Sequence, residues 1–254
     1  MIKIAFITGA TAGIGEACAI KFAENKYNLI ISGRRKERLD HLAAELQKRY
    51  GIAVLPAALD VRDKQMVKSF VSSLSEEWKN IDVLVNNAGL ALGLEPFHTG
   101  EEEDWEIMID TNIKGLLYVG KAVSQIMVDR AQGHIINIGS IAGKEVYPKG
   151  NIYSATKHAV DAITKGMRQD LLKHGIRVTQ VAPGAVETEF SIVRFKGDKD
   201  RAAMVYKNYR PLKAADIAEI VYFAASQPEH VNINDILVMP TDQANATIFN
   251  KQEA

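Results

Sequence analysis

Two residues one helical turn apart, Tyr153 and Lys157, carry the first chemistry that the sequence suggests. They lie in the segment GNIYSATKHAV, which covers positions 150–160. On a helix, positions i and i+4 share a face, so the phenol and the ammonium would lie side by side. A neighbouring cation favours the ionised form of a phenol. The pair is therefore either an ordinary helix-surface contact or a phenol held ready to exchange a proton.

A glycine-rich turn, TGATAGIG, follows the first apolar run of the chain. Its glycines are Gly9, Gly13 and Gly15, and such residues at a strand-to-helix turn let the backbone approach a pyrophosphate closely. The helix that follows would present free N–H groups to the anion. Although the spacing departs from G-x-G-x-x-G, its position after a strand and before a helix favours a dinucleotide site over a plain tight turn. The intervening residues of the predicted cofactor loop are Thr11, Ala12 and Ile14.

The end of the second apolar run bears on which dinucleotide would bind. A carboxylate about 20 residues after the glycine turn is typical of NAD, because it binds the ribose 2′-hydroxyl. Here the run ends in Gly33, Arg34 and Arg35, without a carboxylate. Two guanidinium groups suit a 2′-phosphate, so the sequence favours NADP over NAD. The alternative is that the two arginines only begin a solvated helix.

Seven short apolar runs alternate with longer segments of helical pattern. The helical segment at positions 36–50, for example, has Leu39, Leu42, Leu46 and Tyr50 at helical spacing. Nearly continuous apolar runs are typical of parallel strands buried on both faces. We therefore predict an α/β fold with a doubly wound parallel sheet, as one Rossmann domain over residues 1–254. The predicted strands are IAFIT, NLIIS, AVLPAAL, IDVLVNN, GHIINIGS, IRVTQVAPG and DILVMP.

Composition excludes several other classes of protein. The 254 residues carry 31 basic and 31 acidic side chains, for a formal net charge of zero, which does not indicate nucleic-acid or membrane binding. The single cysteine, Cys18, allows no intramolecular disulfide and suits a reducing compartment. The apolar run near the N-terminus is too short for a signal peptide or a membrane span. A cytoplasmic protein is the resulting expectation.

Hydrolase and metal chemistry are disfavoured by the motifs. Ser140 lies in IGSIAG, which does not fit the G-x-S-x-G pattern of a nucleophilic serine. The six histidines are scattered without H-E-x-x-H, so we predict no metal site. The acidic run at 101–104 is explained by a helix N-terminus, with Thr99 and Glu102 as a capping box.

Taken in order, the glycine turn, NNAG at 86–89, Asn112, Ser140 and the Tyr153–Lys157 pair resemble the short-chain dehydrogenase/reductase family. The resemblance covers nearly the whole chain. It implies that Tyr153 is the general acid/base and that Lys157 both favours its phenolate and holds the nicotinamide ribose. It further implies that Ser140 binds the substrate oxygen and that Asn112 holds a water in a proton relay.

The same resemblance implies further cofactor contacts. Asp60 and Val61 would contact the adenine, and Asn87, Ala88 and Gly89 the cofactor at the end of the fourth strand. The loop PGAVETEF would lie beside the nicotinamide, with contacts from Pro183, Gly184, Val186 and Thr188. Glu187 and Glu189 in that loop receive no assignment.

Three segments, NNAGLALGLEP, FSIVRFKGD and HVNIN, resemble the NADP-dependent 3-hydroxy acid dehydrogenases within that family. This resemblance implies small substrates such as L-allo-threonine, L-serine or 3-hydroxypropionate, or malonic semialdehyde in the reverse direction. Such substrates carry a carboxylate, for which Arg194 is our candidate partner. Lys196 and Lys149 are weaker candidates, and Tyr147 is expected to wall the pocket. The charged stretch at about 190–212 suits a flap over the substrate, but also an ordinary surface helix.

Two other functions stay open at this stage. One is a general carbonyl or 3-oxoacyl-carrier reductase of the same family. The other is a non-catalytic NADP-binding regulator, because fold does not fix function. Family resemblance also implies a homotetramer that associates through the helices carrying Asn112 and Tyr153.

Overall fold

The computed structural model of the chain describes residues 2–252. Its centre is a seven-stranded, all-parallel sheet in the order β3-β2-β1-β4-β5-β6-β9. The seven predicted apolar runs all form strands of this sheet, which confirms the doubly wound α/β prediction. The strands are β1 Ile4–Thr8, β2 Asn28–Gly33, β3 Val54–Ala58, β4 Ile81–Asn86, β5 Gly133–Ile138, β6 Ile176–Pro183 and β9 Asp235–Val238.

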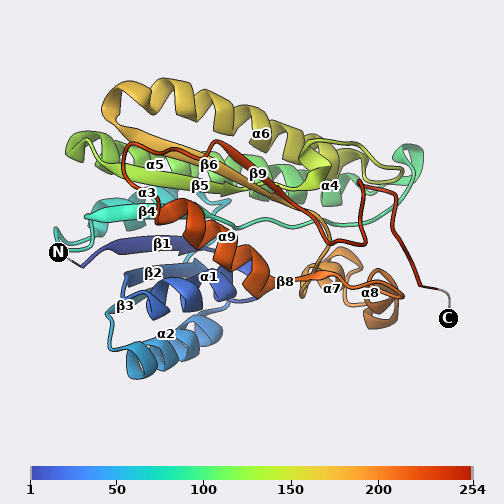
Figure 1. Cartoon of the computed structure of the whole chain (residues 1–254), viewed down its shortest axis with the longest axis horizontal. Coiled ribbons are helices and arrows are strands. Elements are labelled where there is room, and N and C mark those ends of the chain that lie inside the picture. Colours follow the sequence, from blue (N-terminus) through green and yellow to red (C-terminus); the bar gives the residue numbers. More distant parts are fainter. Residues whose placement is uncertain (1, 253–254) are drawn as a thin grey trace.

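Helices cover both faces of the sheet (Figure 1). On one face lie α1 Gly13–Glu24, α2 Lys36–Tyr50 and α9 Ala214–Ala225. On the other lie α3 Lys64–Ser73, α4 Glu102–Ile109, α5 Leu116–Arg130 and α6 Asn151–Leu171. Each face buries its own apolar core against the sheet, so the strands are buried on both sides, as their continuous apolar sequences require.

The strand order reverses next to β1, whose neighbours are β2 on one side and β4 on the other. In open parallel sheets, ligands bind outside the carboxyl ends of the strands at such a switch point. At that edge lie two short helices, α7 Phe190–Arg194 and α8 Lys199–Met204, and a small ladder of β7 Val186–Glu187 with β8 Leu212–Lys213 (Figure 1). The helices α7 and α8 lie within the stretch at about 190–212 for which the sequence predicted a flap, and β7 and β8 lie at its two ends.

A π-helical turn, Asp110–Gly115, joins α4 to α5 without a break in the helix. Its wider winding turns Asn112 into the protein, where the side chain is buried. The amide Nδ2 donates to the Leu90 carbonyl (2.8 Å) and to the Thr156 hydroxyl (3.0 Å), and Oδ1 accepts from the Leu90 N–H (2.8 Å). Asn112 therefore links the loop after β4, through Leu90, to α6, through Thr156.

The predicted capping box of α4 was wrong. Thr99 ends a 3-10 turn, Phe97–Thr99, and its hydroxyl donates to the Pro96 carbonyl (3.2 Å). The N-cap residue of α4 is Glu101, and it makes no side-chain capping bond. Three acidic side chains in the first turn remain favourable for the helix dipole, so the charge argument survives without the cap.

Candidate active site

A cavity of about 630 Å³ opens at the carboxyl edge of the sheet, over the switch point between β1 and β4. Nearly all the residues singled out from the sequence line it. These are Gly9, Thr11, Ala12, Gly13, Ile14, Arg34, Arg35, Asp60, Val61, Asn87, Ala88, Gly89, Ser140, Tyr147, Tyr153, Lys157, Pro183, Gly184, Val186, Thr188 and Arg194. Four do not: Gly15 lies against the Gly9 carbonyl within the glycine turn, Asn112 is buried, and the weaker cation candidates Lys149 and Lys196 lie elsewhere.

The glycine turn forms a close-packed cradle at the floor of the cavity. Gly9 and Gly13 adopt positive φ angles of 67° and 58°, which favour glycine. A Cβ on Gly15 would fall against the Gly9 carbonyl oxygen and 2.5 Å from Nδ2 of Asn87. That Asn87 nitrogen in turn donates to the Thr8 carbonyl (2.8 Å) and to the Gly9 carbonyl (3.3 Å). The turn can therefore present backbone N–H groups to a ligand with no side chain in the way.

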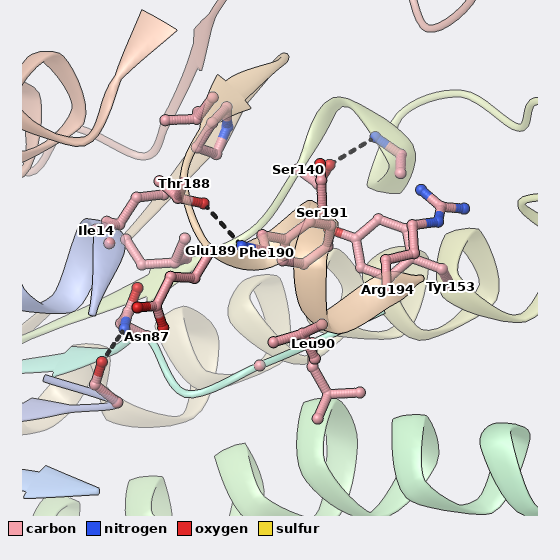
Figure 2. Close-up of a pocket in the computed structure, with 18 of the residues that line it drawn as sticks. Ile14, Asn87, Leu90, Ser140, Tyr153, Thr188, Glu189, Phe190, Ser191 and Arg194 are labelled. Carbon is pink, nitrogen blue, oxygen red and sulfur yellow. Dashed lines mark hydrogen bonds between the residues drawn. The ribbon is translucent and has the colours of Figure 1, made fainter. Parts of the chain in front are cut away.

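Ser140, Tyr153 and Arg194 lie together at one side of the cavity in Figure 2, while Ile14, Asn87 and Thr188 lie at the other. Ser140 follows β5, and its Oγ accepts a hydrogen bond from the Ala142 N–H (3.1 Å). Tyr153 is in the first turn of α6 and is buried. Burial raises the pKa of Tyr153, and so does Tyr147, while hydrogen bonding with Ser140 and the Arg194 charge lower it.

Lys157 lies one turn along α6, with Nζ 5.9 Å from the centre of the Tyr153 ring. The ammonium group is buried and donates to the Ile138 carbonyl at the end of β5 (2.9 Å). Burial lowers the pKa of Lys157 to about 8. The tyrosine and the lysine thus share one helix face, as the i, i+4 spacing predicted, and both point into the protein.

Arg194, the last residue of α7, is held at the cavity by two hydrogen bonds with the backbone of Gly93, one from its own backbone and one from its side chain. Its carbonyl accepts from the Gly93 N–H (3.0 Å), and its Nε donates to the Gly93 carbonyl (3.0 Å). The guanidinium lies 5.6 Å from the ring centre of Tyr147 and 5.8 Å from that of Tyr153. Among residues 2–252 it has no carboxylate partner, so its two terminal nitrogens are available to an anion.

The two weaker cation candidates lie elsewhere. Lys196 forms an ion pair with Asp104 (2.9 Å), which links the segment after α7 to α4. Lys149 lies by a second, much smaller cavity. Of the three cations considered from sequence, Arg194 is the one that lines the main cavity.

At the opposite end of the cavity the two predicted arginines differ. Arg35 is committed to protein partners: Nε and Nη2 donate to the Thr11 hydroxyl (3.1 and 2.9 Å), and Nη1 pairs with Glu189 (2.8 Å). Within the described part of the chain Arg34 has no hydrogen-bonded side-chain partner, and it lines the cavity near Asp60, whose pKa it helps to lower after the larger effect of Arg62. Arg34 is thus the freer guanidinium.

Several lining residues were not singled out from the sequence. Arg38, which is outside this lining, shares the Glu189 carboxylate with Arg35 (2.8 Å), and the three-residue spacing between Arg35, the N-cap of α2, and Arg38 could have suggested this. Ser191 precedes Arg194 by three residues on α7, a spacing that also places two side chains on one face. Four further lining residues come from segments distant in sequence and have no local signal: Tyr206, Tyr209, Gln243 and Phe249.

Comparison with known proteins decides the family. The family model described as short chain dehydrogenase matches residues 3–199. The chain belongs to the short-chain dehydrogenase family.

Among residues 2–252 no cluster of three or more metal-ligating side chains occurs, and no helix there is both long and apolar enough to cross a membrane.

Three relatives within this family are especially similar. The NADP-dependent 3-hydroxy acid dehydrogenase YdfG of Salmonella typhi is 51% identical over 244 residues, 96% of this chain and 97% of that protein. Sulfoacetaldehyde reductase 2 of Chromohalobacter salexigens is 46% identical over 96% of both chains. A solved structure, the closed form of serine dehydrogenase complexed with NADP+, superposes with a TM-score of 0.91 at 47% identity, covering 98% of this chain and 100% of that one.

Proposed function

We propose that this protein is an NADP-dependent oxidoreductase that interconverts small 3-hydroxy acids and the corresponding 3-oxo acids. The observation that carries the proposal is the division of one cavity into two ends. A buried phenol, a serine hydroxyl and a free guanidinium meet at one end, and a glycine cradle leads to a second free guanidinium at the other. The 3-hydroxy acid and serine dehydrogenases among its relatives support the same reading.

The residues present fit NADP. The cradle of Gly9, Gly13 and Gly15 would hold the pyrophosphate, for which a larger side chain would leave no room. Arg34 would take the 2′-phosphate, since a guanidinium suits paired hydrogen bonds to phosphate. When bound, the nicotinamide supplies a site that accepts or donates a hydride. Lys157, buried at the carboxyl end of β5, would bind the nicotinamide ribose.

Tyr153 would move the proton that accompanies the hydride. In oxidation the phenolate removes the proton of the 3-hydroxyl group, and in reduction the phenol returns it to the 3-oxo oxygen. Ser140 would donate a hydrogen bond to the same substrate oxygen. Burial is the largest effect on the Tyr153 pKa and raises it, while the nearby Arg194 cation acts in the opposite direction and favours the ionised phenol. Because Tyr153 and Ser140 are both buried, the proton transfer would take place away from bulk water.

The decisive experiment measures initial rates of NADP⁺ and NAD⁺ reduction with L-allo-threonine, L-serine and 3-hydroxypropionate. We expect turnover with NADP⁺, and a loss of about 10²- to 10⁴-fold in kcat for Tyr153→Phe, the range of general acid–base catalysis. NADPH binding, followed by fluorescence, should survive in the variant. NADPH binding by the wild type without turnover of any of these substrates would contradict the proposal and favour a carbonyl reductase or a regulator.

A second candidate substrate class is the short sulfonated aldehydes. It is favoured by the 46% identity to sulfoacetaldehyde reductase 2 and by the chemistry of Arg194, since a guanidinium binds a sulfonate as it binds a carboxylate. Malonic semialdehyde and sulfoacetaldehyde both place an anion near the aldehyde. NADPH oxidation with the two aldehydes, compared by kcat/KM, ranks the two classes.

Arg194→Ala tests the anion-binding role on which both classes depend. A hydrogen bond to a charged group contributes roughly 1.5–3 kcal/mol, so we expect KM for 3-hydroxypropionate to rise by about 10- to 100-fold. An uncharged short-chain carbonyl compound, assayed with NADPH, serves as the control and should lose much less. An equal loss on both substrates would mean that Arg194 supports the loop rather than the anion.

We also propose that the enzyme works in the cytoplasm as a homotetramer. Of the two helical regions that the family resemblance implicates, the one that carries Asn112 has partly exposed apolar side chains on either side of it, Ile109 on α4 and Leu117 on α5, which are 38% and 39% exposed. Light scattering after size-exclusion chromatography would measure the mass, and a monomer of 28.0 kDa would contradict the assembly.

A further inference from the structure

Two hydroxyl groups, those of Ser191 and Tyr206, are joined by a 2.7 Å hydrogen bond at the wall of the cavity. Ser191 is the second residue of α7 and is 4% exposed. Arg194 follows it by three residues, so the two side chains share a helix face. Figure 2 shows Ser191 and Arg194 projecting from the same short helix beside Tyr153. Ser191 is therefore a polar group next to the predicted anion site that the proposed reaction does not yet use.

The direction of this hydrogen bond follows from its third member. The Tyr206 hydroxyl lies 2.9 Å from the carbonyl oxygen of Val186, which can only accept. Because a phenol has one proton, that proton goes to Val186, and Ser191 must donate its own proton to Tyr206. Burial raises the pKa of Tyr206, while hydrogen bonds from Ser191 and the Thr188 backbone lower it, which agrees with an accepting phenol oxygen.

A serine hydroxyl that has donated its proton retains two lone pairs. No other hydrogen bond to Ser191 Oγ occurs within residues 2–252, so both lone pairs remain for a ligand. The Ser191 oxygen is thus set as an acceptor, not as a donor. An acceptor beside the anion site suits a substrate that carries a cation next to its carboxylate.

No carboxylate competes for such a cation within the described lining of the main cavity near Tyr153. The two lining carboxylates, Asp60 and Glu189, are at the end where Arg34 and Arg35 lie, and both are already paired, Asp60 with Arg62 and Glu189 with Arg35 and Arg38. Glu95 lines the second, smaller cavity together with Tyr153 and Arg194, but it already accepts from the Leu94 N–H (2.6 Å) and pairs with Arg201 (3.8 Å). Within the main cavity, a substrate ammonium near Tyr153 therefore meets neutral acceptors.

We propose that Ser191, with its proton held by Tyr206, accepts a hydrogen bond from the α-ammonium of a 3-hydroxy amino acid whose carboxylate pairs with Arg194. Ser191 is then the residue by which the protein distinguishes 3-hydroxy amino acids from 3-hydroxy acids without an amino group. The assignment rests on the proposed function, since it names the substrate class of the same site.

The test compares two substrates that differ only by the amino group, L-serine and 3-hydroxypropionate, with saturating NADP⁺. The measured quantity is the ratio of their kcat/KM values. Ser191→Ala should lower this ratio by about 10- to 100-fold, the effect of losing a hydrogen bond to a charged group. Tyr206→Phe should lower it in the same direction by about three- to tenfold, because the serine proton is then free to turn toward the ammonium.

Glu95→Gln is the matched comparison, because Glu95 is a carboxylate beside the second, smaller cavity that Arg194 also lines. If Glu95→Gln lowers the ratio and Ser191→Ala does not, the ammonium binds the carboxylate and the inference is wrong. A ratio within twofold of the wild type in both Ser191→Ala and Tyr206→Phe also overturns it. Wild-type enzyme that turns over neither substrate would instead contradict the proposed function, and NADPH fluorescence titration establishes that each variant is folded.

Discussion

At the scale of single residues, the two arginines after β2 look alike in sequence but have different surroundings. All three side-chain nitrogens of Arg35 donate hydrogen bonds to Thr11 or Glu189, whereas Arg34 lines the cavity without a side-chain partner in the described structure. A guanidinium already paired with a carboxylate has less to offer a phosphate. We therefore propose Arg34 as the principal partner of the 2′-phosphate, with Arg35 in a secondary role.

We therefore expect Arg34→Ala to raise KM for NADP⁺ by about 10- to 100-fold, the effect of one charged hydrogen-bonded contact. KM for NAD⁺, which lacks the 2′-phosphate, should change little. Arg35→Ala should have a smaller effect on NADP⁺, because Glu189 already occupies part of its guanidinium. Steady-state kinetics with both cofactors checks this, and a larger loss in Arg35→Ala would reverse the ranking.

Two glycines also have different surroundings, and a substitution by alanine should therefore have different effects at each. Gly15 has backbone and Asn87 atoms where a methyl group would go, while Gly166, in the interior of α6, has nothing within 4 Å. Gly15→Ala should raise the Kd of NADPH by more than about tenfold, as the cradle has to shift. Gly166→Ala should leave NADPH binding alone and raise the free energy of unfolding by roughly 0.5–1 kcal/mol. Fluorescence titration and urea unfolding measure the two effects.

At the scale of elements, the short helix α7 is anchored at both ends. Its N-cap residue, Glu189, bridges Arg35 and Arg38 of the α2 region, and its last residue, Arg194, exchanges two hydrogen bonds with Gly93. One helical segment thus connects the end of the cavity that would hold the 2′-phosphate with the end that would hold the substrate. We propose that this segment is part of the predicted flap, since the ion pairs at its first anchor are exposed and its second anchor, at Gly93, is only partly buried.

A second set of contacts joins α6 to the sheet edge. Asp161 of α6 pairs with Lys144 (2.5 Å) and Lys165 (2.5 Å), and Lys144 also pairs with Asp235 of β9 (2.6 Å). Burial raises the pKa of Asp161, but the hydrogen bonds from the two lysines outweigh it and lower the pKa to about 2. The carboxylate is therefore more acidic in the folded protein than in the unfolded chain.

The sign of the pH effect follows. A carboxyl group with a lowered folded-state pKa stabilises the fold above its unfolded pKa of about 4, and this contribution is lost as the pH falls through about 2. The contribution is on the order of 2 kcal/mol. We expect the difference in unfolding free energy between wild type and Asp161→Asn to shrink between pH 4 and pH 2 in urea titrations. A difference that stays constant over this range would contradict the lowered pKa.

At the scale of the whole molecule, the cavity draws its walls from most of the chain, from the glycine turn near the N-terminus to Phe249 near the C-terminus. Tyr209 packs against Phe249, with ring centres 4.8 Å apart, so the segment after β9 closes one side of the cavity. A ligand in this cavity would contact both halves of the sheet and the segments that cover its edge. Ligand binding should consequently stabilise the molecule as a unit.

NADPH should raise the free energy of unfolding by about 2.7 kcal/mol at a free concentration 100 times its Kd. NADH at the same concentration should give a much smaller effect, because it lacks the group that Arg34 would bind. Thermal unfolding followed by circular dichroism, with each cofactor in turn, measures the difference. Equal shifts for the two cofactors would contradict NADP preference at the level of binding.

Much of this protein could be read from the sequence, because the signals concerned are local. Apolar runs of strand length, the glycine turn and the i, i+4 spacing of Tyr153 and Lys157 depend only on neighbouring residues. They predicted the seven strands and the face that Tyr153 and Lys157 share. The family resemblance depended on the order of the same motifs along the chain.

Other features were decided only by the tertiary structure. Whether Arg34 or Arg35 is free depends on Glu189, which is more than 150 residues away in sequence. Whether Ser191 donates or accepts toward the cavity depends on Tyr206 and, through it, on the Val186 carbonyl. Even the predicted cap of α4 was wrong because the backbone before the helix turned into a 3-10 segment. The sequence determined which chemical groups are present and on which elements, but the partners of each group, and hence which groups remain free for a ligand, are set by long-range contacts that no local pattern encodes.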